Sequence, residues 1–424
     1  MYQERSNISY MLLCCLFLFI SCSGKKTRDN TDLQKVKPYP HVISMEKGLE
    51  NNDQLKLSEI ADSIEYAVLS KDRKVLIGSL GRLQMTDNYI YINSEGLVMR
   101  FDLTGRFLNS YGGIGRGPEE YLAGSIYSTT PKDDKILILR SMMYDYLVYE
   151  PDGTYSGRKE LSYPRNMFDF VVMTDSSYLM TFLFIGRFMN VDVFNAMPAI
   201  AGLYDFDGRP VKLIEHPLRN KNISEADLKR VIISNPGYSF FDGRVVLSPE
   251  GDTIYEIDKS TVAPGFIISW GQIPHQQTTD EKFYLQETKT SKIVNYMPLF
   301  ETYRKAYFRG RNMNDYFIFE YDKISGTCRT MTADEDNIGL INDLDGGANY
   351  FPVKTNRRGD IWIAYEDAIK FKERHSDDFF LQSVALYPDK KEKLRLFVSD
   401  LEPDDNPVLK IVYLKKQAAL TGCD

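Results

Sequence analysis

Histidine and cysteine are scarce in this chain, which limits the metal and thiol chemistry that it can carry. Four histidines are spread over 424 residues, with no two at helical or strand spacing: His41, His216, His275 and His375. A catalytic metal site that needs several such ligands would have to be assembled from distant parts of the chain. Beyond Cys22 only Cys328 and Cys423 remain, too few for a disulfide framework. The sequence therefore predicts neither a local metal motif nor a disulfide scaffold.

Motifs of common catalytic sites are also missing. No G-x-S-x-G elbow occurs, so Ser-His-Asp catalysis is not indicated. The glycine-rich stretch 113–117 lacks the Lys-Ser/Thr ending of a phosphate-binding loop, and we interpret it as a connection between structural units. The segment NDLDGG, residues 342–347, offers at most three oxygen ligands and is better explained as a turn than as half a calcium loop. Carboxylates are plentiful, but sequence alone selects no catalytic pair. We predict no catalytic residues.

Positive charge is not in excess. Lys and Arg number 52 against 59 Asp and Glu, which gives a formal net charge of −7 and a pI near 5.4. Proteins that bind nucleic acids need a basic face. We therefore expect no nucleic-acid partner, although a local basic patch is compatible with this balance.

The N-terminus contains an apolar run that is too short to span a membrane as a helix. It extends from Tyr10 to Ile20 and, as a helix, would rise about 16 Å, against the roughly 30 Å of a bilayer core. We interpret it as the core of a signal peptide over residues 1–21. Residues 22–54, which begin rich in Lys, Asp and Thr, are predicted to be a tether.

The end of the apolar run, Phe19-Ile20-Ser21-Cys22, resembles the bacterial lipobox. The resemblance implies cleavage before Cys22 and a lipid on its sulfur. It would anchor an exported protein to the outer membrane, at the periplasmic or the cell-surface face. Phe19 stands where Leu is usual, and the polar start lacks the usual several cations. An ordinary signal peptide with an incidental cysteine is the alternative.

Aromatic residues are abundant and favour strands. The chain has 28 Tyr and 24 Phe against 2 Trp, and such residues suit a pleated, half-buried surface. Aromatic platforms for sugars or peptides are the other use of these rings, and composition does not separate the two. We predict an all-β protein.

Hairpin units recur about every fifty residues. They join alternating strands through turns such as Glu95-Gly96, where Gly supplies the positive φ that tight hairpins require. Aromatic markers of five units are separated by 48, 55, 51 and 66 residues: Phe101, Tyr149, Tyr204, Tyr255 and Tyr321. This period predicts a six-bladed β-propeller over residues 55–415, with four-stranded antiparallel blades, the sixth inferred from length. Residues 416–424 would form a C-terminal tail.

Three segments in the second half depart from the hairpin pattern or complete it. Residues 279–308 mix charges with apolar residues and predict a helical insertion or a long edge strand with a decorated loop. Residues 391–401 predict a helix. The helix is expected to end before Pro407, because proline disfavours a helical conformation in the residue before it. Residues 408–415 predict a strand that pairs with an N-terminal strand and closes the ring.

Four stretches together resemble the six-bladed, NHL-like β-propeller lipoproteins abundant in Bacteroides and its relatives: LSEIADSIEYAVL from Leu57, GIGRGPEEYL from Gly113, NDLDGG from Asn342 and NPVLKIVYLK from Asn406. The most specific element is GRGP at 115–118 with Glu120-Tyr121, where the family usually has a second Gly in place of Glu119. The resemblance spans most of the chain from Leu55 and implies a fold and a compartment. The family is largely without an assigned reaction, so no activity is carried over.

The most suggestive binding feature is the basic stretch 304–311, in which aromatic residues are interleaved among the cations. Its candidate ligand-binding residues are Arg304, Tyr307, Arg309 and Arg311. A cationic, aromatic-lined surface could hold an acidic sugar or peptide by stacking and charge-assisted hydrogen bonds. The alternative is a solvated strand edge whose aromatic side chains lie in the core.

These features favour a non-catalytic binding or scaffold lipoprotein of the cell envelope, with a glycan, a peptide or a partner protein as its ligand. The alternative is a metal-dependent propeller enzyme of lactonase or lyase type that holds a divalent metal in a central channel. A purely structural module of a larger envelope complex is a third hypothesis. The sequence identifies no cofactor.

Overall fold

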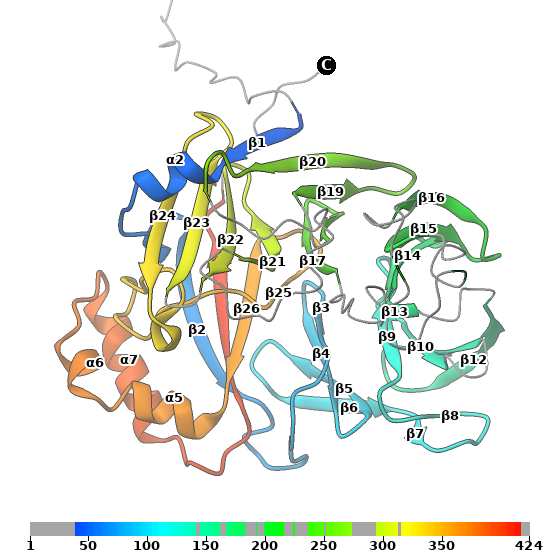
Figure 1. The fold of residues 1–424 in the computed structure, drawn as a ribbon. Helices are drawn as coiled ribbons and strands as arrows, with labels where there is room; N and C mark the ends of the chain where they lie inside the picture. The colour runs from blue at the N-terminus through cyan, green and yellow to red at the C-terminus, as the bar shows by residue number, and fades with distance from the viewer. Residues whose placement is uncertain are drawn as a thin grey trace, which may run out of the picture. The chain divides into compact units, whose positions relative to one another are not determined.

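The protein is an all-β ring. Its computed structural model describes residues 39–140, 145–161, 167–182, 199–215, 236–249, 252–273, 294–312 and 315–416, together with residues 192 and 224. Six sheets, each built on four antiparallel strands, stand around a common centre (Figure 1). This arrangement confirms the predicted six-bladed β-propeller. No helix in the described ranges is long and apolar enough to cross a bilayer.

The blades follow one another along the chain. Blade 1 contains β3 (Leu83–Met85), β4 (Tyr89–Ser94), β5 (Leu97–Asp102) and β6 (Phe107–Tyr111). Blade 2 contains β9 (Ile126–Thr129), β10 (Ile136–Arg140), β11 (Asp145–Tyr149) and β12 (Tyr155–Glu160). Blade 3 contains β13 (Met167–Val172), β14 (Ser177–Phe182), β15 (Ala201–Asp205) and β16 (Pro210–Ile214).

The second half of the chain forms the other three blades. Blade 4 contains β17 (Gly237–Phe241), β18 (Arg244–Ser248), β19 (Thr253–Ile257) and β20 (Val262–Ser269). Blade 5 contains β21 (Val294–Glu301), β22 (Lys305–Arg311), β23 (Tyr316–Asp322) and β24 (Cys328–Ala333). Blade 6 contains β25 (Lys354–Thr355), β26 (Ile361–Glu366), β27 (Val408–Leu414) and, as its outer strand, β2 (Ala61–Val68).

The aromatic markers lie on equivalent strands. All five belong to the third strand of their blade, namely β5, β11, β15, β19 and β23. The third strand of blade 6 is β27, and its aromatic residue is Tyr413, 92 residues after Tyr321. The gap is long because three helices separate β26 from β27: α5 (Ala368–Arg374), α6 (Asp378–Gln382) and α7 (Pro388–Ser399). The helix predicted over 391–401 is α7.

Two other predicted segments are placed by the structure. The glycine-rich stretch lies between blades 1 and 2, where β7 (Gly113–Ile114) and β8 (Glu120–Tyr121) form a short parallel pair, so it is a connection between blades as interpreted. The described part of residues 279–308 consists of strands β21 and β22 of blade 5. Residues 279–293 lie outside the described ranges.

Each pair of adjacent blades shares an apolar layer. Because side chains alternate along a strand, β26 sends Ile361 and Ile363 into the layer with blade 1 and Trp362 into the layer with blade 5. Strand β22 does the same with Phe308 toward blade 4 and Tyr307 toward blade 6. Corresponding clusters join blades 1 and 2, and blades 2, 3 and 4. Both faces of every blade are therefore buried, which no single sheet could achieve.

The ring is closed by a strand from the N-terminal side. Strand β2 pairs antiparallel with β27 along its length, from Ala61 opposite Leu414 to Val68 opposite Val408. This pairing confirms the predicted closure. Blade 6 thus combines residues from both ends of the propeller.

Residues 39–60, here called the N-terminal strap, are folded onto the outside of the ring. Strand β1 (His41–Ser44) adds to β20 of blade 4 in parallel, and α2 (Met45–Glu50) packs beside β24 of blade 5. Asn52 then bridges to Thr330, and a 3-10 turn, η1 (Leu57–Glu59), leads into β2. Residues 39–54, which were predicted to belong to the tether, are part of this strap and include β1 and α2. The predicted signal peptide, the tether up to residue 38 and the tail from 417 lie outside the described residues.

Ring closure predicts a measurable contribution from the interface between blades 6 and 1. Leu409 on β27 is fully buried there, so Leu409→Ala should lower the free energy of unfolding by about 2–5 kcal/mol. Leu396→Ala is the matched control because Leu396 is 57% exposed on α7, and it should change stability by less than about 0.5 kcal/mol. Chemical denaturation followed by fluorescence measures both. Equal effects of the two variants would contradict this account of the closure.

Candidate functional site: the axial cation cluster

The first strands of the blades converge at the centre of the ring (Figure 1). Three basic residues meet there and are here called the axial cation cluster. Arg82 immediately precedes β3 of blade 1, Lys354 is the first residue of β25 of blade 6, and Arg357 lies in the turn after β25. Non-adjacent blades approach one another only at the axis. The two arginines therefore contact blades that do not neighbour their own.

Arg82 connects blade 1 with blades 3 and 4. Its guanidinium forms an ion pair with Asp169 on β13. The same Nη2 approaches the carbonyl oxygen of Phe170 at 3.4 Å and the hydroxyl of Tyr238 at 3.5 Å. Asp169 is buried, so this carboxylate is already committed to Arg82.

Arg357 crosses the ring from blade 6. Its Nη2 donates hydrogen bonds to the carbonyl oxygens of Thr129 on β9 (2.6 Å) and Val172 on β13 (3.0 Å). The guanidinium lies 5.0 Å from the centre of the Phe240 ring. Burial lowers the pKa of Arg357 to about 10, although Asp134 and Asp87 favour its charged form from further away. Arg357 therefore holds together the ends of first strands from blades 2 and 3.

Lys354 is the least compensated of the three cations. Its Nζ lies 3.8 Å from the centre of the Tyr238 ring, a cation–π contact. No carboxylate, carbonyl or hydroxyl of the described residues accepts a hydrogen bond from it. Burial, reinforced by the neighbouring charge of Arg82, lowers the pKa of Lys354 to about 7.

The cluster as a whole carries more positive than negative charge at hydrogen-bond range. Asp169 is the one carboxylate within the described residues that pairs with it, and the buried Nε atoms of Arg82 and Arg357 have no acceptor in the same ranges. A buried cation without a counter-charge is costly. Loss of the Lys354 proton relieves that cost, and so does a bound anion. The arrangement suits the recognition of an anionic group.

The four residues predicted as a binding site are not gathered on one surface. Tyr307 is 1% exposed and its hydroxyl donates to the Glu320 carboxylate at 2.7 Å, so its ring is part of the core. Arg304 lies in the turn before β22 and pairs with Asp322 at 2.7 Å. Arg311 is half-buried at the far end of that strand, about 23 Å from Arg304 at the usual strand rise.

Arg309 packs against an aromatic ring of blade 6. Its guanidinium stacks 4.8 Å from the centre of the Phe351 ring, three residues before Lys354, and burial lowers its pKa. The binding role of the four residues stays a prediction.

Sequence reasoning missed Arg82, Lys354 and Arg357. Arg82 and Lys354 are 272 positions apart, so no local motif contains both. The sequence offers one local indication of these residues, the basic run KTNRRGD at 354–360. In the structure this run forms the short strand β25 and the turn that follows it.

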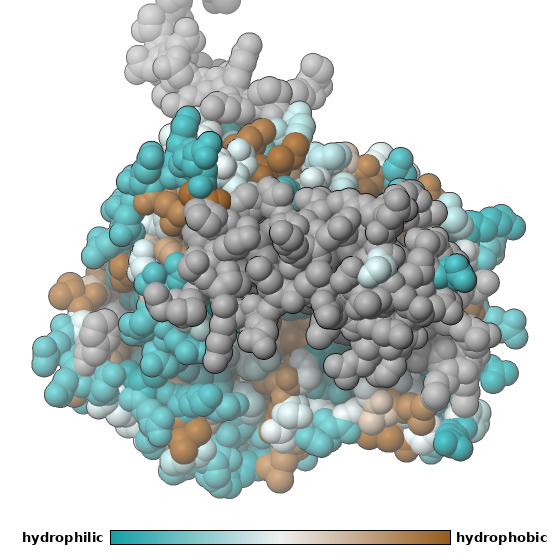
Figure 2. Space-filling view, viewed as in Figure 1, coloured by the Kyte–Doolittle hydropathy of each residue, from teal (hydrophilic) through white to brown (hydrophobic). Residues whose placement is uncertain are grey.

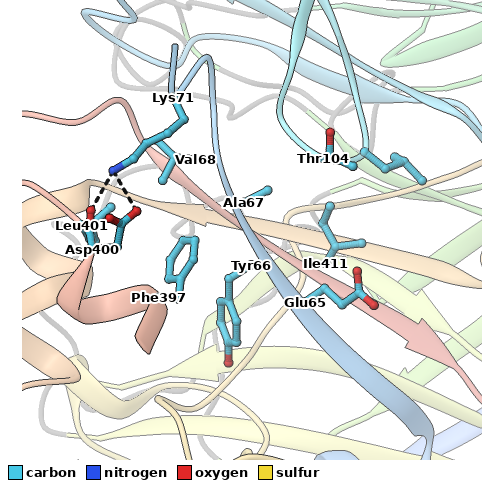
Figure 3. A pocket seen from close by; sticks show the side chains of 11 residues that line it. Glu65, Tyr66, Ala67, Val68, Lys71, Thr104, Phe397, Asp400, Leu401 and Ile411 are labelled. Atoms are coloured by element: carbon cyan, nitrogen blue, oxygen red, sulfur yellow. Dashed lines mark hydrogen bonds and ion pairs between the residues drawn. The ribbon is translucent and has the colours of Figure 1, made fainter. Parts of the chain in front are cut away.

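A second candidate is a pocket of about 300 Å³ at the outer edge of blade 6 (Figure 3). It lies between β2, α7 and the turn at 103–104. Lys71 at its rim donates to the Asp400 carbonyl oxygen (2.8 Å) and to the Asp405 carboxylate (2.7 Å), so its positive charge is already satisfied. Its lining combines apolar side chains such as Val68 and Phe397 with polar ones such as Thr104. This pocket lacks the unmet charge of the axis.

The segment 368–399, which contains α5, α6 and α7, carries several exposed apolar side chains. Figure 2 shows hydrophobic surface at the left edge of the molecule, where Figure 1 draws this segment. Four of its side chains are more than half exposed: Leu381, Val384, Leu386 and Leu396. Their contacts define no ligand chemistry.

The segment NDLDGG is a hydrogen-bonded turn. The Asp345 carboxylate accepts hydrogen bonds from the Asn342 amide (2.7 Å), the Gly347 N–H (3.0 Å) and the Tyr66 hydroxyl (3.0 Å). Across the ranges that the structure describes, no group of three His, Cys, Asp or Glu side chains is placed to hold a metal ion.

Comparisons with known proteins agree with the propeller fold. A family model described as a domain of unknown function, DUF4934, matches residues 40–413. A solved structure from Bacteroides fragilis, described as an exported protein, is 17% identical, with 89% of this chain and 99% of that chain covered and a TM-score of 0.62. A DUF4221 member from Bacteroides vulgatus is 10% identical, with coverages of 84% and 98% and a TM-score of 0.48. The search of curated proteins found no match.

Arg357 and its neighbour Arg358 allow a matched test of the axial contacts. Arg357→Met leaves the Thr129 and Val172 carbonyl oxygens without this donor, so the free energy of unfolding should fall by about 1–3 kcal/mol. Arg358 is 61% exposed and pairs with Asp87 at the surface, so Arg358→Met should cost less than about 1 kcal/mol. Urea titration measures both variants. A smaller loss for Arg357→Met than for Arg358→Met would refute the role of Arg357 as a bridge between blades.

Proposed function

The chain belongs to the DUF4934 family, and we propose that it is an exported, lipid-anchored, non-catalytic binding propeller that recognises an anionic ligand at its axial cation cluster. The observation that carries this proposal is Lys354, a partly buried residue whose amine lies against the Tyr238 ring near Arg82 and has no hydrogen-bond acceptor among the described residues. A ligand anion would supply that acceptor. No catalytic step is required for such a role.

The chemistry of the cluster favours a carboxylate-bearing ligand, such as an acidic glycan or an acidic peptide. Charge-assisted hydrogen bonds to a carboxylate are stronger than neutral ones. The rings of Tyr238 and Phe240 lie against the cations and provide flat apolar surface beside the charge. A sugar ring or a peptide stem that carries a carboxylate would match both features.

Export and anchoring are supported by the N-terminal sequence. The lipobox-like stretch ending at Cys22 follows a signal-like apolar run, and the solved B. fragilis protein is described as exported. We propose the outer membrane as the site of the anchor, at its periplasmic or cell-surface face. The four-stranded blades of about fifty residues also agree with the proposed kinship to NHL-like propellers.

The lipid anchor predicts a clear outcome for Cys22→Ser. In the native host the unchanged protein should incorporate a labelled fatty acid and sediment with membranes, because acylation buries alkyl chains in the bilayer. The Cys22→Ser variant should lose the label and leave the membrane fraction. Cys423→Ser serves as the control and should retain both. Labelling that persists in Cys22→Ser would exclude this residue as the anchor.

Ligand binding is tested with purified protein and paired probes. Oligogalacturonate and a poly-glutamate peptide should bind, whereas neutral galactose oligomers and a poly-glutamine peptide should not. Lys354→Met should weaken binding at least tenfold at pH 6.5, because it removes the uncompensated cation. Lys212→Met removes an exposed lysine on β16 of blade 3 and should leave affinity unchanged. Calorimetry measures each pair. Failure of every anionic probe, or full binding by Lys354→Met, would overturn the proposed function.

A further inference from the structure

We infer that the axial site binds its anion together with a proton, which is taken up by the Lys354 amine. The inference rests on the proposed function and adds to it a dependence on pH. The inference follows from the surroundings of the Lys354 side chain. An experiment can contradict it and still show that the site binds an anion.

The groups around Lys354 provide no negative charge for it. From blade 1 it is faced by the Arg82 cation, and from blade 4 by the Tyr238 ring. The Asp169 carboxylate of blade 3 pairs with Arg82. Arg357, on the turn that follows Lys354, is directed to the Thr129 and Val172 carbonyl oxygens. Among the described groups, the amine therefore has one charged neighbour, the Arg82 cation, and one aromatic neighbour, the Tyr238 ring.

The two protonation states of Lys354 have different requirements. An ammonium group has three donors and no acceptor capacity, and here it would face Arg82 without any described acceptor. A neutral amine avoids the repulsion from Arg82 and needs less hydration. Burial and Arg82 together lower the pKa of Lys354 to about 7, so the free site contains both states near neutral pH.

A bound anion reverses this balance. Its negative charge favours the ammonium form, so the pKa of Lys354 rises when the site is occupied. Thermodynamic linkage then requires that proton binding and anion binding strengthen each other by the same factor. Below about pH 7 the amine already holds its proton, and affinity is constant. Above that pH each binding event must also take up a proton, and affinity falls by up to tenfold per pH unit until the raised pKa is reached.

The arginines of the cluster do not contribute to this slope near neutral pH, because guanidinium groups keep their proton there. The pH dependence is thus specific to Lys354. A lysine-to-arginine change at this position should retain the charge and remove the slope.

The experiment measures the titration of Lys354 directly, with and without a ligand. The purified protein is labelled briefly with acetic anhydride from pH 5.5 to 10, and acetylation of Lys354 is quantified by mass spectrometry. The labelling midpoint should lie near pH 7 in the free protein and at least one pH unit higher with saturating oligogalacturonate. Lys212 is the internal control, and its midpoint should not move when the ligand is added.

Calorimetry at pH 7 in two buffers of different ionisation enthalpy completes the test. It should show uptake of about half a proton per anion bound, and affinity should be at least about fivefold lower at pH 8.5 than at pH 6. Lys354→Arg should bind with equal affinity at both pH values.

The possible failures are distinguishable. A midpoint for free Lys354 in the ordinary lysine range, or an anion that binds without shifting the midpoint, overturns this inference and leaves anion binding intact. If no anion binds at any pH, the proposed function fails and the inference fails with it. Because the labelling uses the unchanged protein, this result does not depend on the folding of any variant.

Discussion

Burial of both faces of every blade is the constraint on which the rest of this structure depends. A four-stranded sheet with apolar side chains on both faces is unstable in water unless each face meets another sheet. Here every adjacent pair of blades shares an apolar layer. The circle requires a last contact between blades 6 and 1, and pairing of β2 with β27 fixes blade 6 in place for it. Closure also leaves fewer free strand edges.

Closing the circle also determines the chemistry at its centre. The first strands converge, so polar side chains at their ends meet across the axis even when their blades are distant in sequence. Arg82 and Arg357 satisfy their charge by holding other blades, through Asp169 and through two carbonyl oxygens. Lys354 has no such partner in the described ranges. The structural role of the two arginines and the proposed binding role of the lysine therefore arise from the same packing.

The repeat was predictable from sequence because each blade repeats a local pattern. Markers such as Tyr149 and Tyr204 identified third strands directly, while Tyr413 was hidden by the helices between β26 and β27. The axial site was not predictable, since Arg82 and Lys354 meet only after the ring closes. The stretch 304–311 does not form one continuous surface, and the reason is physical. Residues that alternate along β22 enter two different blade interfaces, so a run that looks like one surface in sequence is divided in the fold.

The N-terminal strap lies on the outer side of the ring, where β1 adds to the last strand of blade 4. The described chain enters the propeller at the outer edge of blade 4, where His41 packs among Tyr39, Phe266 and Tyr321. Burial first, and then the charge of Lys323, lowers the pKa of His41 to about 4, so β1 joins the sheet with a neutral imidazole at neutral pH. From there the strap continues past blade 5 to β2 of blade 6. The first described strand therefore lies on the outer edge of blade 4, on the side of that blade away from its first strand at the axis.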